Sequence, residues 1–116
     1  MTCLPKLALA AALSLGASAA LAEIDILSVA FNCENNTRIP VTYFNASDGS
    51  GAAALVLNGE LIAMRQVPSG SGIQYESVDA NGLYTLRSKG WDATITHQPA
   101  GSTAPETLLF RDCSSR

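Results

Sequence analysis

Large apolar residues fall on alternate positions along much of the chain, which is the pattern of β-strands with one buried face. In the run 27–33, leucine, valine, phenylalanine and cysteine occupy every second position, and the run 39–43 repeats the alternation. The dipeptide at 35–36 is Asn-Asn, which supplies a turn between these two strands. Pro40 favours an edge position or a bulge, because proline cannot donate a hydrogen bond to a neighbouring strand.

The strongest local signal is a hairpin over residues 55–64. Two apolar runs there flank Asn58-Gly59. Asn-Gly favours the type I′ turn, in which both central residues take a positive φ. We therefore expect two antiparallel strands joined by a two-residue turn.

Glycine, serine and proline separate the remaining apolar runs. These runs predict four further strands, over residues 73–78, 83–88, 91–97 and 108–113. Short strands at near-regular spacing, without a helical stretch, predict an all-β meander of about eight strands. Such a sheet gains by closing into a small antiparallel barrel, because closure removes exposed strand edges. We expect one such domain, spanning residues 23–116.

The N-terminus has the features of an export signal. One positive charge at Lys6 precedes an apolar run and then a stretch of small residues. Ala20-Leu21-Ala22 has the form that signal peptidase reads, with residues 17–19 as an alternative cleavage site. We expect residues 1–22 to be removed as a signal peptide, leaving a soluble periplasmic protein.

The cysteines fit an exported chain. Cys3 leaves with the signal peptide, so only Cys33 and Cys113 remain, and in an oxidising compartment we expect them to form one disulfide that closes the barrel. A loop of that size contributes about 4 kcal/mol in the chain-entropy view of disulfide stabilisation. No cysteine lies at the cleavage site to carry a lipid anchor. The apolar stretch 7–22 has 16 residues, fewer than the ~20 that span a membrane, so we expect neither an anchor nor a span in the mature chain.

The charge balance is mildly acidic. The formal net charge of −3 becomes −4 once Lys6 is removed with the signal peptide. This balance argues against nucleic acid as a partner. It would steer a basic protein towards the surface, although it serves plain solubility equally well.

Little in the sequence indicates catalysis. The single histidine, His97, has no nucleophile with a recognisable motif near it, and it reads as a surface residue at a strand end. The carboxylates are scattered singly, and no His/Cys/Asp/Glu group has the spacing of metal ligands. We therefore expect neither an enzyme nor a metal or other cofactor.

Two segments carry a more specific signal. Taken alone, Ser69-Gly70-Ser71-Gly72 is a flexible connector, and Lys89 before Gly90 is a solvated turn lysine. Together they contain two motifs, Ser-Gly-x-x-Tyr ending at Tyr75 and Tyr-x-x-x-x-Lys-Gly-x-acid-Ala over residues 84–93. In this order, between Cys33 and Cys113, the motifs resemble those of the membrane-bound and periplasmic inhibitors of c-type lysozyme.

The resemblance implies an eight-stranded antiparallel barrel that occludes the cleft of a c-type lysozyme and so protects peptidoglycan. Ser71 would be the inserted hydroxyl and Lys89 the ammonium group that pairs with a cleft carboxylate. The glycines at 70 and 72 would let the backbone approach closely, and Tyr75 would pack beside the loop and donate a hydrogen bond to the partner. The implied lysozyme-binding residues are Ser69, Gly70, Ser71, Gly72, Tyr75, Lys89 and Gly90.

Two other functions stay open at this point. A small periplasmic barrel could bind an apolar or peptidoglycan-derived ligand inside, which would require an internal cavity open to solvent. An enzyme acting on the cell wall would require two cleft carboxylates at the separation that glycosidases use.

Overall fold

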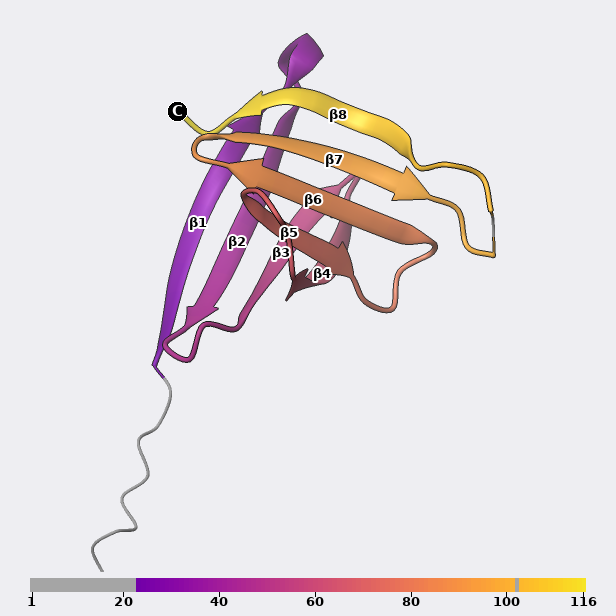
Figure 1. The fold of residues 1–116 in the computed structure, drawn as a ribbon. Helices are drawn as coiled ribbons and strands as arrows, with labels where there is room; N and C mark the ends of the chain where they lie inside the picture. Colours follow the sequence, from indigo (N-terminus) through magenta and orange to yellow (C-terminus); the bar gives the residue numbers. More distant parts are fainter. Residues whose placement is uncertain (1–22, 102) are drawn as a thin grey trace, which may run out of the picture.

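The computed structural model describes residues 23–101 and 103–116, and they form an all-β barrel. Eight strands follow one another with one short 3-10 helix, η2, between the first two (Figure 1). Their bounds are β1 Ile24–Asn32, η2 Glu34–Asn36, β2 Arg38–Ala46, β3 Gly51–Leu57, β4 Glu60–Val67, β5 Ile73–Ser77, β6 Leu83–Lys89, β7 Asp92–Gln98 and β8 Thr107–Ser114. The predicted eight-stranded antiparallel barrel is confirmed.

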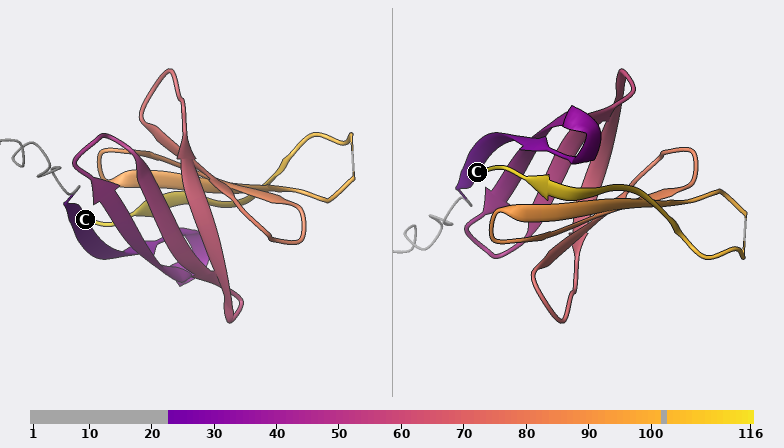
Figure 2. Two further views of the ribbon diagram at one scale, coloured as in Figure 1. Left: turned by 90° about the horizontal axis from the view of Figure 1, so that it is seen from below. Right: turned by 90° about the horizontal axis from the view of Figure 1, so that it is seen from above.

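Each strand pairs antiparallel with the next, and β8 returns to β1. In Figure 1, β1 to β4 run steeply while β6 to β8 cross in front of them, and the two further views show the same crossing (Figure 2). The closing ladder is minimal. β1 and β8 share the single pair Asn32 and Ser114, whereas β1 and β2 pair along their whole lengths.

The hairpin between β3 and β4 has the geometry that its sequence predicts. Asn58 and Gly59 both have positive φ, 51° and 79°, and Leu57 pairs with Glu60 across them. Asparagine and glycine tolerate this left-handed conformation better than other residues. The two-residue turn fixes the register of both strands.

The interior is filled by side chains from alternate positions of the strands. At its centre, Leu55, Leu86 and Ile95 are each 0% exposed. Leucine and isoleucine side chains thus fill the middle of the barrel.

The first strand differs most from its prediction. It begins at Ile24 rather than at residue 27, because Ile24 to Leu27 pair with the far end of β2. The alternation of this strand predicts that Leu27 points towards the core, yet the residue is 54% exposed. Among the described residues, β8 pairs with β1 only at Asn32, so Leu27 lies beyond the closing ladder.

Pro40 lies where a missing donor is tolerated. It pairs with Ala30 of β1, and the ladder to β3 begins only at the next residue, Val41. The proline therefore occupies a stretch of β2 with a neighbour on one side only, as its edge preference requires.

The disulfide between Cys33 and Cys113 is confirmed. It connects the residue after β1 to the end of β8, beside the single pair of the closing ladder. Both cysteines are buried. The covalent bond thus joins the barrel at the point where the backbone ladder is shortest.

The expected signal peptide, with Cys3, lies outside the described residues. Within residues 23–101 and 103–116, no helix has the length and hydropathy needed to cross a membrane. The same residues contain no group of three or more His, Cys, Asp or Glu side chains arranged to hold a metal ion.

Candidate functional site

The two segments singled out in the sequence meet in space. The Ser/Gly loop, residues 68–72, leads into β5, and Ile73 at the start of β5 pairs with Ser88 of β6. This register places the end of the loop next to Lys89, the last residue of β6. Two segments separated by a whole hairpin are therefore neighbours on one edge of the barrel.

Gly72 permits this close approach. Its φ is +70°, and a Cβ atom built there would lie 2.5 Å from the Ser88 carbonyl oxygen and 3.3 Å from Cβ of Lys89. Any side chain would therefore push the loop away from β6. Gly70 is different, because its φ is not positive and a Cβ would meet nothing within 4 Å. The conformational argument made for both glycines holds only for Gly72.

Within the loop, the Ser69 side chain is hydrogen-bonded to the backbone, whereas the Ser71 side chain is exposed to solvent. The Ser69 hydroxyl donates to the Ser71 carbonyl oxygen at 2.9 Å and accepts from the Ser71 amide at 3.4 Å. The Ser71 side chain is exposed, and its hydroxyl has no hydrogen bond to any described residue. It is therefore available to a partner.

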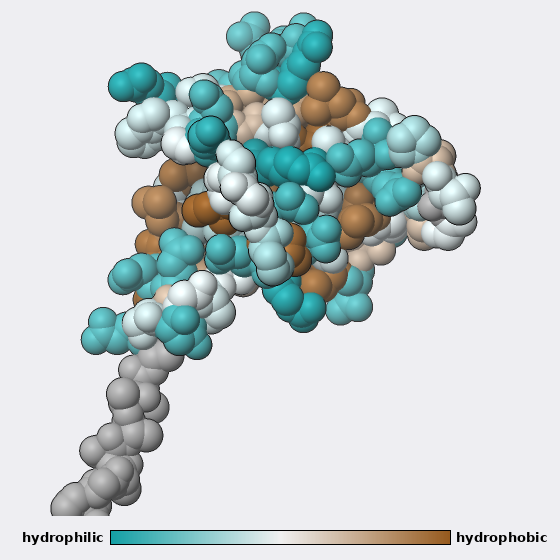
Figure 3. All heavy atoms as spheres, in the orientation of Figure 1, coloured by the Kyte–Doolittle hydropathy of each residue, from teal (hydrophilic) through white to brown (hydrophobic). Residues whose placement is uncertain are grey.

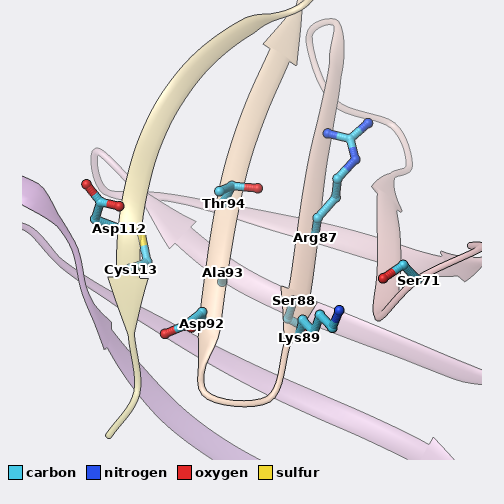
Figure 4. A pocket seen from close by; sticks show the side chains of 9 residues that line it. All are labelled: Ser71, Arg87, Ser88, Lys89, Asp92, Ala93, Thr94, Asp112 and Cys113. Carbon is cyan, nitrogen blue, oxygen red and sulfur yellow. The ribbon is translucent and has the colours of Figure 1, made fainter.

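Ser71 and Lys89 line one open pocket of about 470 Å³ (Figure 4). The Lys89 side chain extends towards the loop that carries Ser71, whereas Asp92 and Asp112 lie on the other side of the pocket. The remaining lining residues are Arg87, Ser88, Ala93, Thr94 and Cys113. The pocket combines two cationic and two anionic side chains on the outer face of β6 to β8.

The two cations differ in how they are held. Arg87 forms an ion pair with Glu106 at 3.2 Å and donates to the Thr96 hydroxyl, which itself donates to Glu106. Lys89 is exposed and has no ion pair or hydrogen bond among the residues that the structure describes. Arg87 is thus neutralised by its own chain, and Lys89 keeps an unpaired charge.

Tyr75 occupies the core and not the surface. Its side chain is 1% exposed and lies against Tyr43, with ring centroids 5.5 Å apart. Burial raises the pKa of both phenols, that of Tyr43 to about 12. The expected hydrogen bond from Tyr75 to a partner is not available in this conformation. The residue supports the base of the Ser/Gly loop from inside the barrel.

Gly90 forms the turn after Lys89 with a φ of +61°. Three charged residues of the pocket, Arg87, Asp92 and Asp112, were not predicted as site residues, although Asp92 is the acid of the second motif. Arg87 could have been found, because side chains two positions apart on a strand share a face and Lys89 was already implicated. Asp112 lies where β8 bulges against β7, with a φ of 50°, and no turn signal in the sequence marks that bulge.

Comparisons with known proteins agree on one family. Residues 31–103 match the family described as membrane-bound lysozyme-inhibitor of c-type lysozyme. The membrane-bound lysozyme inhibitor of C-type lysozyme from Pseudomonas aeruginosa is 35% identical over 74 residues, which are 64% of this chain and 55% of that protein. The match thus spans about half the length of that relative.

A solved structure is similar over almost its whole length. It is the periplasmic lysozyme inhibitor of C-type lysozyme from Salmonella typhimurium, with a TM-score of 0.68 and 27% identity, covering 79% of this chain and 99% of that chain. Both relatives are named as inhibitors of lysozyme, and neither name describes an enzyme.

Proposed function

The chain belongs to the family of membrane-bound lysozyme-inhibitors of c-type lysozyme, and from this premise we propose that it inhibits a c-type lysozyme by filling the active-site cleft with Ser71 and Lys89. The observation that carries the proposal is their joint position: an unpaired ammonium group and a free hydroxyl line one pocket on one side of the barrel. We propose further that the inhibitor acts in the periplasm after removal of residues 1–22, and that it has no catalytic activity of its own.

The chemistry of a lysozyme cleft fits these two groups. The cleft holds a protonated glutamic acid and an ionised aspartate on either side of the bond to be cleaved. A serine hydroxyl can donate to the carboxylate or accept from the carboxylic acid, and Lys89 can pair with an anion. Because Lys89 has no competing partner within the described residues, a cleft carboxylate would not have to displace one.

The residues around Ser71 and Lys89 favour a Ser/Gly loop with one fixed conformation. Gly72 lets the Ser/Gly loop pack against β6, and the Ser69 hydroxyl bridges the loop backbone. Tyr75 of β5 is buried and its ring packs against Tyr43 of β2, which fixes the strand that follows the loop. Preorganised loops lose less conformational entropy on binding, so more of the contact energy appears as affinity. Occlusion of this kind requires an interface of ordinary size with a few central anchors and no covalent step.

The proposal is tested by lysis of bacterial cell walls by a c-type lysozyme, followed as loss of turbidity. Increasing amounts of purified chain 23–116 should abolish lysis at close to stoichiometric ratios. Lys89→Ala should raise the concentration needed for half-inhibition at least tenfold, because an interface anchor of this kind contributes about 1 to 4 kcal/mol.

Arg38→Ala is the matched control for this experiment. Arg38 is an exposed base at the start of β2 and does not line the pocket of Ser71 and Lys89. Its removal changes the net charge equally and should leave inhibition within about twofold, as expected of charges outside an interface core. Full lysis in the presence of a severalfold excess of folded wild-type protein would exclude the proposed function. Equal inhibition by both variants would remove Lys89 from the site.

A further inference from the structure

A second recess opens on the inner side of the sheet. It has a volume of about 200 Å³ and lies at the mouth of the barrel, where the first half of β1 has no β8 beside it. Its walls include Leu27, Phe31, Tyr43, Ile73, Tyr75 and Trp91. Two of these residues, Phe31 and Tyr75, belong to the buried core, so the recess reaches the core from the mouth of the barrel.

The rim of this recess exposes large apolar side chains. Leu27 is 54% exposed, Ile73 44% and Trp91 57%. These residues come from three separate strands or turns and surround a single opening. Hydrophobic residues also gather over β1 on the face seen in Figure 3. Apolar groups concentrated around a concave opening indicate a binding site more often than isolated exposed residues do.

The walls carry no charge. None of the residues that line the recess is Asp, Glu, Lys, Arg or His. The charge beside the recess is positive, because the Arg116 guanidinium lies over the Trp91 ring, 5.9 Å from its centroid. A cationic ligand would therefore lose its water there without gaining a counter-ion, which is costly. This separates the recess from the neighbouring pocket of Ser71 and Lys89, in which four charged side chains meet.

Neutral polar groups are nevertheless present. The Tyr43 hydroxyl and the Ser88 side chain interact with each other, and both residues line the recess. Burial raises the pKa of Tyr43 to about 12, so its hydroxyl stays protonated at neutral pH and can donate a hydrogen bond. The recess thus offers aromatic walls with a hydroxyl pair at one place.

We propose that this recess binds a small uncharged molecule with a single aromatic ring and one hydroxyl group. Size supports the ring, since an apolar cavity of about 150 Å³ is known to accept benzene. The hydroxyl would bond to Tyr43 or Ser88 while the ring contacts Trp91 and Ile73. This inference rests on the inner face of the barrel and does not depend on lysozyme inhibition.

The test uses p-cresol as the probe and the protein's own tryptophan as the reporter. Trp91 is the only tryptophan in the chain, and it lines the recess. Its fluorescence, excited where phenols do not absorb, should change saturably as p-cresol is added to chain 23–116, with a dissociation constant below ~1 mM. The cationic analogue 4-methylbenzylamine, which is protonated at neutral pH, should not produce a saturable change, because no acidic side chain lines the recess and Arg116 lies over Trp91.

Two variants locate the binding. Val29→Phe places a ring in the recess and should abolish the response, whereas Val56→Phe, the same change on the opposite face of the sheet, should leave it intact. Tyr43→Phe should weaken p-cresol binding about fivefold, the loss of one neutral hydrogen bond, and leave toluene binding unchanged. Far-ultraviolet circular dichroism shows whether Val29→Phe is folded. If it is not, the comparison of p-cresol with toluene in Tyr43→Phe still tests whether the ligand binds in the recess.

The proposal is overturned if wild-type fluorescence changes only linearly with p-cresol, as collisional quenching does. It is also overturned if folded Val29→Phe binds as the wild type does, or if Tyr43→Phe weakens toluene and p-cresol equally. Because lysozyme is absent from this experiment, its failure is distinguishable from failure of the proposed inhibition.

Discussion

At the scale of single residues, the candidate site depends on Gly72 more than on the groups that would touch lysozyme. The side chains of Ser71 and Lys89 are exposed, and either could be replaced without disturbing the core. Gly72 combines a positive φ with a backbone contact that leaves no room for a Cβ atom. It therefore sets the distance between the Ser/Gly loop and β6.

Gly72→Ala should destabilise the fold and weaken inhibition. A non-glycine residue in the left-handed region costs about 1–2 kcal/mol, and the contact with the Ser88 carbonyl adds to this, so thermal unfolding should shift down by roughly 5 to 10 °C. Gly70→Ala is the control, because a Cβ there meets nothing within 4 Å. Its unfolding temperature should stay within about 2 °C of the wild type. Equal shifts for the two variants would refute the role assigned to Gly72.

The serines, Gly72 and Lys89 were predicted as site residues from the two motifs that resemble the inhibitor family, and the structure brings the two motifs together. The role expected for Tyr75 depended on the fold. Tyr75 belongs to the same motif, but its period-two position places it on the inner face with Leu86 opposite it. Strand alternation, applied to the motif itself, would have assigned it to the core.

At the scale of elements, the strands and their closure into a barrel followed from alternation, turn chemistry and the disulfide, whereas the extent of the closing ladder did not. The Asn58-Gly59 turn fixes the β3–β4 hairpin by local preferences alone. The length of the β1–β8 ladder depends on how far two chain ends overlap, and no local signal encodes it. Because that ladder has a single pair, half of β1 is uncovered and the recess at the mouth exists.

The weak closing ladder makes the disulfide the principal connection between the first and last strands. Replacing Cys33 and Cys113 by alanine should lower the free energy of unfolding by about 4 kcal/mol, the value for a loop of this length. Urea unfolding, with and without a reductant, measures this loss in the free energy of unfolding. Reductant should lower the midpoint of the wild type and leave the double variant unchanged. An unaltered wild-type midpoint under full reduction would show that the backbone ladder alone closes the barrel.

At the scale of the whole molecule, the same β5–β6–β7 region presents two different chemistries. Its outer face carries the charged pocket of Ser71 and Lys89, and its inner face forms the uncharged recess with Trp91 at its rim. Ser88 lines both, because it lies between them on β6. The charged pocket proposed to contact lysozyme and the apolar recess proposed to bind a small molecule thus lie on the two faces of the same strands.

The central claim is that this protein fills the active-site cleft of lysozyme, and competition with a cleft ligand tests it most directly. The affinity of chain 23–116 for a c-type lysozyme is measured by titration calorimetry, alone and with a saturating short oligomer of N-acetylglucosamine. Mutually exclusive binding predicts that the apparent Kd rises in proportion to the oligomer concentration. An apparent Kd that stays constant while the cleft is occupied would contradict the account.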